Sequence, residues 1–257
     1  MTSSSRLPVI ALVAVLALAA PWIAYPVFLM TALCFALFAC AFNLLLGYVG
    51  IYFAMITLAF AQMVYFFCVQ APFTHGEDGL QGITRKPLLG GLIPTKDDRV
   101  LYYVVLAIFL FGFFAIHRII HSPFGQVMKA IRDNEQRALS LGYEADRYKL
   151  LAFVLSAALA GLAGATKAMV LQFATLTDVS SAMSGEVVLM ALVGGLGTII
   201  GPVVGAFVIV TMQNYLASTG EFVLVIQGFI FVVIVMAFRK GLVGELSDWW
   251  KARRKAA

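Results

Sequence analysis

Long apolar runs separated by short polar stretches dominate the chain. A helix needs about 20 apolar residues to cross the hydrocarbon core of a bilayer, and the runs lack the strict alternation of a transmembrane β-strand. They therefore predict a bundle of transmembrane helices. The runs cover residues 7–25, 27–50, 51–71, 100–119, 150–173, 184–217 and 222–238.

The run 184–217 is interrupted in its middle by GGLG at residues 194–197 and by GP at residues 201–202. Glycine and proline weaken a helix, and a broken helix at membrane depth persists only inside protein or along a cavity. We therefore expect two shorter helices, about 184–196 and 199–217. The predicted fold is an all-α, polytopic membrane helical bundle with about eight membrane segments.

Composition agrees with this class. The 257 residues are 62% hydrophobic and only 12% charged, whereas a soluble domain carries about 25% charged residues. The sequence contains no GxSxG, HExxH or Walker motif, and its three cysteines lie in apolar runs without the spacing of metal ligands. We expect no catalytic site, no metal site and no cofactor bound by this chain.

The distribution of lysine and arginine predicts how the chain is oriented. Basic residues are densest in the segments 121–149 and 239–257, whereas the loop 72–99 is balanced by acidic residues. The positive-inside rule places both basic segments and both termini on the cytoplasmic side of the membrane, and the loop outside. Because the basic residues lie at membrane borders, we expect contact with membrane lipid and no nucleic-acid partner.

The N-terminal run follows Arg6 and includes ALA at residues 17–19, a pattern that also occurs at signal-peptide cleavage sites. We interpret it as an uncleaved first span, because apolar sequence resumes at once with Trp22.

Polar residues inside spans are costly and often line a path through the membrane. Lys167 allows two interpretations: its ammonium group extends to the membrane interface, or it faces a cavity. No acidic residue is expected deep in a span, which argues against a proton relay and an ion-coupled secondary carrier. The candidates for a translocation path are Thr57, Gln62, Lys167, Gly194, Gly195 and Gly197.

Two series of small residues predict close helix packing, because small faces let the backbones of helices approach each other in lipid. We favour packing within one subunit; a dimer interface or a pore-lining face are the alternatives. The series are Gly197, Gly201 and Gly205, and Ala157, Gly161 and Ala165.

The segment 122–142 is a charged, amphipathic island between two apolar runs. Ser122 and Pro123 predict the start of a helix, and Gly142 predicts a stop. The helix is expected either to lie on lipid headgroups or to dock into a cleft on a soluble cytoplasmic partner. Its apolar side is formed by Phe124, Val127, Met128 and Ile131.

The island carries a resemblance to a known family. SPFGQVMKAIRDNEQRALSLGYEADRYKLLAFVLSAALAGLAGA, residues 122–165, is similar to the cytoplasmic loop and following span of the branched-chain amino-acid permeases of ABC importers. GIYFAMITLAFAQMVYF at 50–66, GEDGLQGI at 76–83, SGEVVLMALVGGLGTIIGPVVGA at 184–206 and FRKGLVG at 238–244 agree with that family. The chain resembles its M-type membrane subunit more than the H-type.

The resemblance implies a type II-like ABC importer permease domain over residues 1–257. It implies a heterodimer with a second permease subunit, two cytoplasmic ATPase subunits that hold ATP and Mg, and a periplasmic or extracellular substrate-binding protein. The cargo would be branched-chain amino acids; urea, another amino acid or a non-transporting membrane assembly role are alternatives. The implied ATPase-coupling residues are Gly125, Lys129, Ala130, Arg132, Asp133, Asn134, Glu135 and Gly142.

One departure from the family pattern concerns the junction between Gly50 and Ile51. Family members usually carry about two further spans between GYxG and GIYFAM, motifs that here follow each other directly. A single helix over residues 27–71 would measure about 67 Å, against about 30 Å of hydrocarbon. We therefore expect a turn near residues 47–50.

Overall fold

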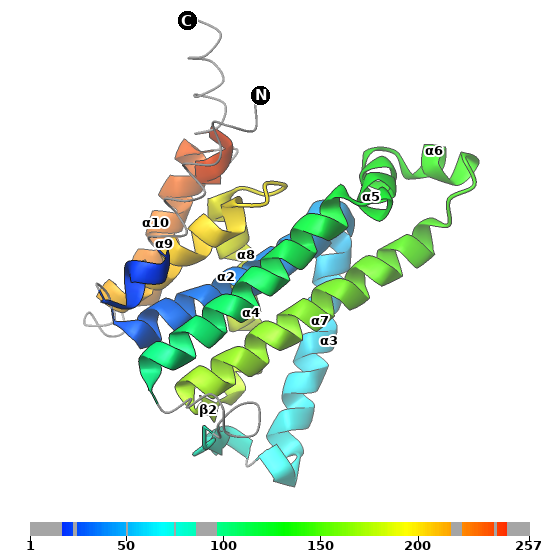
Figure 1. Cartoon of the computed structure of the whole chain (residues 1–257). Helices are drawn as coiled ribbons and strands as arrows, with labels where there is room; N and C mark the ends of the chain where they lie inside the picture. Colours follow the sequence, from blue (N-terminus) through cyan, green and yellow to red (C-terminus); the bar gives the residue numbers. More distant parts are fainter. Residues whose placement is uncertain are drawn as a thin grey trace, which may run out of the picture.

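A computed structural model of the chain describes residues 17–22, 25–49, 51–74, 76–85, 97–216, 223–238 and 241–245. Helices dominate the described part, so the all-α prediction is confirmed (Figure 1). The helices are α2 (Pro26–Val49), α3 (Ile51–Gln70), α4 (Asp98–His121), α5 (Pro123–Asp133), α6 (Glu135–Ser140), α7 (Ala145–Leu171), α8 (Ser181–Gly194), α9 (Gly201–Leu216) and α10 (Val223–Ala237).

Three of the described helices are long and apolar enough to cross a membrane, and they cover Pro26–Gly47, Asp98–His121 and Ala145–Leu171. Four shorter apolar helices accompany them, at Thr57–Gln70, Ser181–Gly194, Gly201–Leu216 and Val225–Ile234. The chain is therefore a polytopic membrane helical bundle. The count of about eight segments stays a prediction, since most of the first run lies outside the described residues.

Helix α2 forms the centre of the bundle and packs against α4, α7, α8 and α9. Its alanines Ala32, Ala36 and Ala39 are fully buried in the cluster shared with α8 and α9. Met30 and Leu33 face α4 on another side. Helix α2 is apolar on all sides, and a helix of this kind is expected in the interior of a bundle.

The predicted break in the run 184–217 is confirmed. Helix α8 ends at Gly194 and α9 starts at Gly201, so the boundaries differ from the expected ones by a few residues. A Cβ on Gly194 would meet the backbone of Gly201, and one on Gly205 would meet the carbonyl of Met190. The two helices thus pack backbone to backbone, and Gly201 and Gly205 serve packing within the subunit.

The turn between α8 and α9 is held by a residue of the central helix. Asn43 donates through Nδ2 to the carbonyl oxygen of Thr198 at 3.0 Å and accepts from the backbone N–H of Gly197 at 3.3 Å. Asn43 is buried, so these two bonds satisfy a polar side chain that would otherwise be costly in the bundle.

The predicted turn between the second and third runs is also confirmed: α2 ends at Val49 and α3 begins at Ile51. In Figure 1, α3 (cyan) leaves the upper end of α2 and runs back down the bundle.

The bundle has two distinct ends. At the upper end in Figure 1, α5 and α6 project from the bundle, and Gly241 lies directly against Gly195. The lower end carries the 3-10 turns η2 (Pro72–Thr74), η3 (Gly76–Asp78) and η5 (Leu176–Val179). There β1 (Leu80–Gln81) pairs with β2 (Phe173–Ala174), with Leu80 opposite Ala174.

The segment 121–149 and residues 241–245 therefore share one end, and the described part of the loop 72–99 lies at the other. This agrees with the predicted orientation of loops relative to each other. Which end faces the cytoplasm stays a prediction, and most of the tail 239–257 lies outside the described residues.

Candidate functional site

The corner between α4 and α5 is built as the sequence predicts. Ser122 caps α5, because its Oγ accepts from the backbone N–H of Gly125 at 3.4 Å, and Pro123 takes the first helical position. Gly125 is buried, and a Cβ there would run into the carbonyl oxygens of Ile119 and Ile120. The corner is therefore too tight for any other residue without a shift of the backbone.

The apolar side of α5 is covered by the chain itself. Met128 and Ile131 are 2% and 3% exposed, and they pack with Ala138, Ala145 and Ala152 in one cluster. The interpretation that this side enters lipid or a partner's cleft is therefore wrong for these two residues. The reason is that α7 begins beside α5 and offers a cover that the spacing within the island does not reveal.

The opposite side of α5 is exposed and charged. Arg132 donates through Nη1 to the carbonyl oxygen of Gly47 at 3.3 Å and pairs with Asp133 at 3.3 Å. Asn134 accepts from the backbone N–H of Arg137 at 2.9 Å and so caps α6. Lys149 of α7 pairs with Glu135 at 2.6 Å. Arg132 is thus bonded to α2, and Glu135 is bonded to α7.

Two apolar residues next to these charges escaped the sequence interpretation. Leu139 and Leu141 are 52% and 70% exposed at the end of α6. Gly142 follows them with φ +87°, which is the left-handed backbone that a stop signal requires. A leucine pair inside a charged island is the signal that could have pointed to them.

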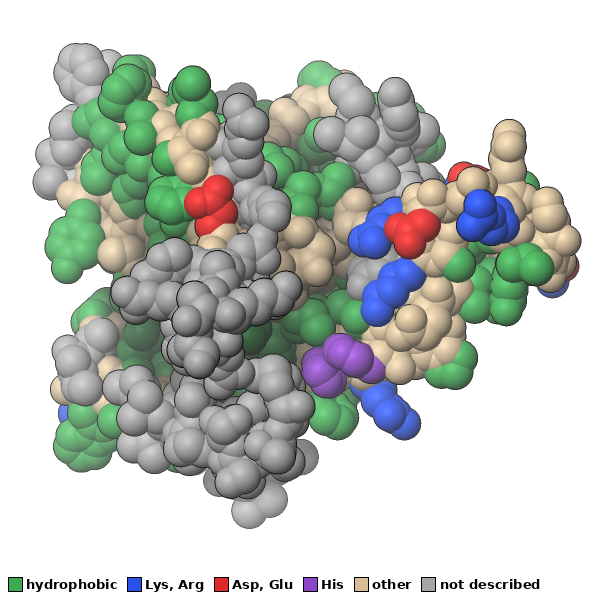
Figure 2. Space-filling view, turned by 90° about the horizontal axis from the view of Figure 1, so that it is seen from above, with side chains coloured by type: hydrophobic (Ala, Val, Ile, Leu, Met, Phe, Trp, Pro, Cys, Tyr) green, Lys and Arg blue, Asp and Glu red, His purple; other side chains and the backbone are tan. Residues whose placement is uncertain are grey.

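We call the exposed part of this projection the coupling surface, after the role that the sequence predicts for it. Figure 2 shows acidic and basic side chains gathered on it, at the right-hand end of the molecule. Six of the eight predicted coupling residues lie on it, with Lys129 half-buried among them. Gly125 is buried in the corner, and Gly142 is exposed but lies beyond the end of α6. The surface consists of Lys129, Ala130, Arg132, Asp133, Asn134, Glu135, Leu139 and Leu141.

A cavity of about 250 Å³ lies towards the other end of the bundle, between α2, α7, η5 and the start of α8. Its α7 wall is made of small residues, Ala160, Ala163, Gly164 and Ala168. The α2 wall carries Phe35 and Phe38, and Met183 closes the α8 side.

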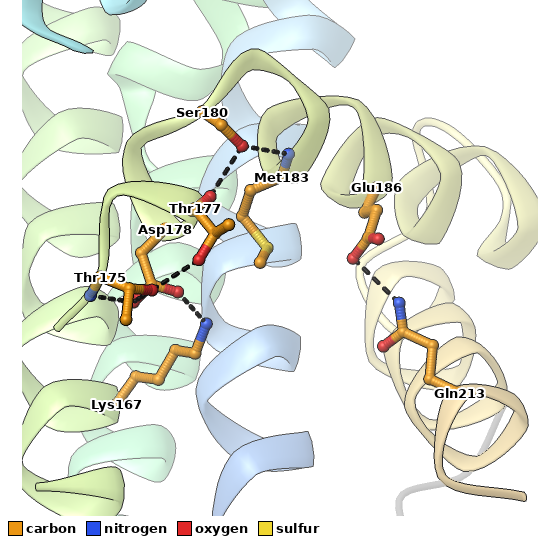
Figure 3. A network of polar contacts seen from close by, with 8 residues as sticks. All are labelled: Lys167, Thr175, Thr177, Asp178, Ser180, Met183, Glu186 and Gln213. Atoms are coloured by element: carbon orange, nitrogen blue, oxygen red, sulfur yellow. Dashed lines mark hydrogen bonds and ion pairs between the residues drawn. The ribbon is translucent and has the colours of Figure 1, made fainter. Parts of the chain in front are cut away.

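Lys167 points into this cavity and has a partner. Its Nζ lies 2.6 Å from Oδ1 of Asp178 in η5 and 4.6 Å from the centre of the Phe35 ring. The Lys167 side chain is 16% exposed, so the cavity-facing interpretation describes it better than the interfacial one. Figure 3 shows Lys167 and Asp178 reaching towards each other, with Met183 descending from α8 beside them.

Asp178 was missed by the sequence interpretation. Its Oδ2 accepts from the backbone N–H of Thr175 at 3.2 Å, which fixes the carboxylate at the start of η5. The T-x-x-D pattern of residues 175–178 is a capping-box signature and could have drawn attention to it.

A second cavity, of about 200 Å³, adjoins the first and shares Phe38 and Ala160 with it. Thr57 of α3 lines this second cavity. Gln62 lines neither, and Gly194, Gly195 and Gly197 lie in the α8–α9 turn, away from both linings. The structure therefore brings Lys167 and Thr57 onto adjoining cavities and separates the other path candidates from them.

An acidic residue inside a span was also overlooked. Glu186 lies in the second turn of α8, where Gln213 of α9 donates to its Oε2 at 2.9 Å (Figure 3). The prediction concerned acidic residues deep in a span, whereas Glu186 lies in the second turn of α8. The bond explains how α8 and α9 tolerate the carboxylate between them. Among the described residues, no group of three His, Cys, Asp or Glu is placed to hold a metal ion.

Comparison with known proteins gives consistent matches. The family model described as branched-chain amino acid transport system / permease component matches residues 4–235. The high-affinity branched-chain amino acid transport system permease protein LivM of Escherichia coli (strain K12) is 28% identical over 248 residues, covering 86% of this chain and 58% of that protein. LivM of Salmonella typhimurium (strain LT2) is 27% identical over 216 residues, covering 76% and 51%.

A relative that is named for a different substrate also matches. The ribose import permease protein RbsC of Bacillus subtilis (strain 168) is 31% identical over 170 residues, covering 63% of this chain and 50% of that protein. The chain spans about half the length of the curated relatives it matches. No solved structure gives a significant match.

Proposed function

The chain belongs to the family of branched-chain amino acid transport system permease components, and from this premise we propose that it is the membrane-spanning subunit of an ATP-driven importer. Its cargo is a branched-chain amino acid, in line with the names of the LivM relatives. Alternating access of the bundle is driven by ATPase subunits that bind ATP and Mg, while this chain binds neither and catalyses no reaction.

One observation carries the proposal: the coupling surface is bonded and packed to helices that line the cavities. Arg132 bonds to Gly47 of α2, and Glu135 pairs with Lys149 of α7. The buried side of α5 packs on α7 through Met128. A partner that pulls on α5 and α6 thus moves α2 and α7 as bodies, which is how a packed interface transmits motion.

The chemistry of the coupling surface suits a soluble partner. Fixed charges of both signs give specificity and steer association, and the exposed Leu139 and Leu141 supply apolar area next to them. We assign this surface to two cytoplasmic ATPase subunits, one on this chain and one on a second permease subunit with which it forms a heterodimer. With this assignment, residues 121–149 and both termini lie on the cytoplasmic side of a bacterial inner membrane.

The opposite end of the bundle is then the outer face. It carries the β1–β2 pairing and the 3-10 turns between Pro72 and Asp78, and the cavity with Lys167 lies towards it. We assign this end to a periplasmic or extracellular substrate-binding protein that delivers the solute.

Two other functions are kept as alternatives. The RbsC relative, which is named as a ribose import permease, favours an importer for a different solute. Urea or another amino acid belong to the same alternative. A non-transporting membrane assembly subunit is the other, because the chain runs from α2 directly into α3 where family members usually continue for about two spans.

The test is affinity purification of the tagged chain from native membranes, with mass spectrometry of its partners and uptake of labelled leucine by the same cells. Recovery of a second permease and ATPases, with uptake that needs ATP, supports the importer. Recovery of these partners without any uptake supports the assembly subunit. Uptake that stops when the proton or sodium gradient collapses while ATP remains contradicts the proposal in favour of an ion-coupled carrier.

The same purification tests the shortened junction. If the chain brings down no ATPase, a version with two family spans inserted after Gly50 is compared with it. Partner recovery by that version alone means that the shortened chain does not assemble. Failure of both versions contradicts the role assigned to the coupling surface.

A further inference from the structure

We propose that the cavity lined by Lys167 and Asp178 binds a zwitterionic amino acid with an aliphatic side chain. Lys167 holds the carboxylate and Asp178 holds the ammonium group. The inference rests on the proposed import function and deepens it, because it assigns substrate recognition to the membrane subunit itself.

The first argument is the pairing of opposite charges at one wall of an apolar cavity. Lys167 Nζ and Asp178 Oδ1 lie 2.6 Å apart, with side chains 16% and 28% exposed. Lys167 lies in the last two turns of α7, and an ionisable side chain within a span is costly and points to a functional site with its partner. An α-amino acid carries the complementary pair of charges on one carbon, so a single ligand can satisfy both groups.

The second argument is that both charged groups keep a partner when the ligand separates them. Asp178 is held through Oδ2 by the backbone N–H of Thr175, which leaves Oδ1 for an incoming ammonium group. Lys167 stays over the face of Phe35, 4.6 Å from the ring centre, where a cation is stabilised. Binding of the ligand thus replaces the Lys167–Asp178 contact by two charge-assisted contacts, one to each residue, and neither residue is left without a partner.

The third argument is the size and polarity of the remaining lining. The cavity measures about 250 Å³, which is below the roughly 300–1,000 Å³ of pockets for drug-sized ligands and suits a single amino acid. Phe35, Phe38 and Met183 surround it with apolar surface, and the small α7 residues Ala160 and Gly164 make the room. An aliphatic side chain can fill this space, whereas a sugar would leave its hydroxyl groups unpaired.

The test is direct binding to the purified full-length chain in lipid nanodiscs. The probes are L-leucine, 3-methylbutylamine, which lacks the carboxylate, and 4-methylpentanoate, which lacks the ammonium group. Wild type should bind leucine and bind each single-charge analogue at least about tenfold more weakly. Absence of leucine binding at millimolar concentration would overturn the proposal.

The variants Lys167→Met and Asp178→Asn should exchange these preferences. Lys167→Met loses at least about tenfold in leucine affinity and gains affinity for the amine, because Asp178 is left with an unmatched negative charge. Asp178→Asn loses leucine affinity and gains affinity for the carboxylate. Equal losses for all three probes, or unchanged leucine binding, would mean that the ion pair only fastens η5 to α7.

A matched control is the ion pair Arg85–Asp98, 2.7 Å apart at the same end of the bundle. Neither residue lines the cavity, so Asp98→Asn should leave the leucine affinity unchanged within about twofold. A tenfold loss in this control would show that leucine binding reports general stability, and would contradict the assigned roles.

The proposal and the import function fail in different experiments. Cells whose leucine uptake needs this chain, but in which Lys167→Met and Asp178→Asn transport like wild type, would retain the import function and lose the cavity assignment. Leucine binding with the exchanged preferences, in a chain that neither recovers ATPases nor supports uptake, would retain the cavity and overturn the importer.

Discussion

Arg132, in the last turn of α5, donates a hydrogen bond from Nη1 to the carbonyl oxygen of Gly47, near the end of α2, at 3.3 Å. The two residues are 85 positions apart, and the bond joins the projecting helix to the most central helix of the bundle. Together with the Glu135–Lys149 pair it joins α5 and α6 to α2 and α7. In the proposed importer, this connection carries the motion of the ATPase to the helices around the cavity.

Charge reversal on the coupling surface should weaken partner docking. The double variant Lys129→Glu with Arg132→Glu places two negative charges where a complementary partner expects positive ones, and we expect about tenfold less ATPase in the affinity eluate. The chain should still insert and elute as a single peak in size exclusion. Arg118→Glu, at the exposed end of α4 and outside the coupling surface, is the control. Equal ATPase recovery from the double variant and wild type would contradict the assigned surface.

Gly125→Ala should destabilise the corner between α4 and α5. The added Cβ collides with the carbonyl oxygens of Ile119 and Ile120, so the backbone must shift at a cost of about 1–3 kcal/mol. The loss is measured as a lower melting temperature of the detergent-solubilised chain. Gly161→Ala on α7 is the matched control, because nothing lies within 4 Å of its Cβ position. A melting temperature equal to that of wild type in Gly125→Ala would mean that the corner is not this tight.

Gly205→Ala tests the backbone contact between α8 and α9. Its Cβ would meet the carbonyl of Met190, and separating the helices also strains the Glu186–Gln213 bond. We expect a loss of about 1–3 kcal/mol and faster proteolysis in the hairpin. Gly228→Ala on α10, which has open space around it, should behave like wild type. Similar proteolysis of both variants would argue against close packing at Gly205.

Arg85 should fasten the residues that follow β1 to the end of α7. Its guanidinium group donates to the carbonyl oxygens of Val170 at 2.6 Å and Met169 at 3.4 Å at the end of α7, and pairs with Asp98. Arg85→Met leaves these carbonyls without their donor, so we expect a loss of about 1–3 kcal/mol and faster protease cleavage between residues 76 and 85. Asp98→Asn removes only the ion pair and should cost less. The opposite order of the two losses would show that the ion pair dominates.

Much of the fold follows from local sequence. Among the described residues, the apolar helices from α2 onward, the break at residues 194–202 and Ser122 as the cap of α5 were predicted within a few residues, because hydrophobic length, helix-breaking glycines and end caps act over one or two helical turns. The break between α5 and α6 at Asn134 was not predicted, since one helix was expected in this segment. The sequence likewise predicted that residues 121–149 and 72–85 lie at opposite ends of the bundle, since each successive helix reverses the direction of the chain.

The sites needed the tertiary structure. Spacing gave α5 an apolar side, but only the position of α7 shows that Met128 and Ile131 are already covered. The two predicted series of small residues differ in their packing. Gly201 and Gly205 pack between α8 and α9, whereas Gly161 lies in open space.

The sequence by itself determined that this is a helical membrane protein, the approximate bounds of its apolar helices, and the charged segment that lies between two of them. Only the tertiary structure decided that Lys167 has Asp178 as its partner and a cavity around it. The reason is physical: the preference for lipid and for helix belongs to a run of neighbouring residues. A charge pair or a cavity arises from side chains on separate elements, whose positions depend on the packing of the whole bundle.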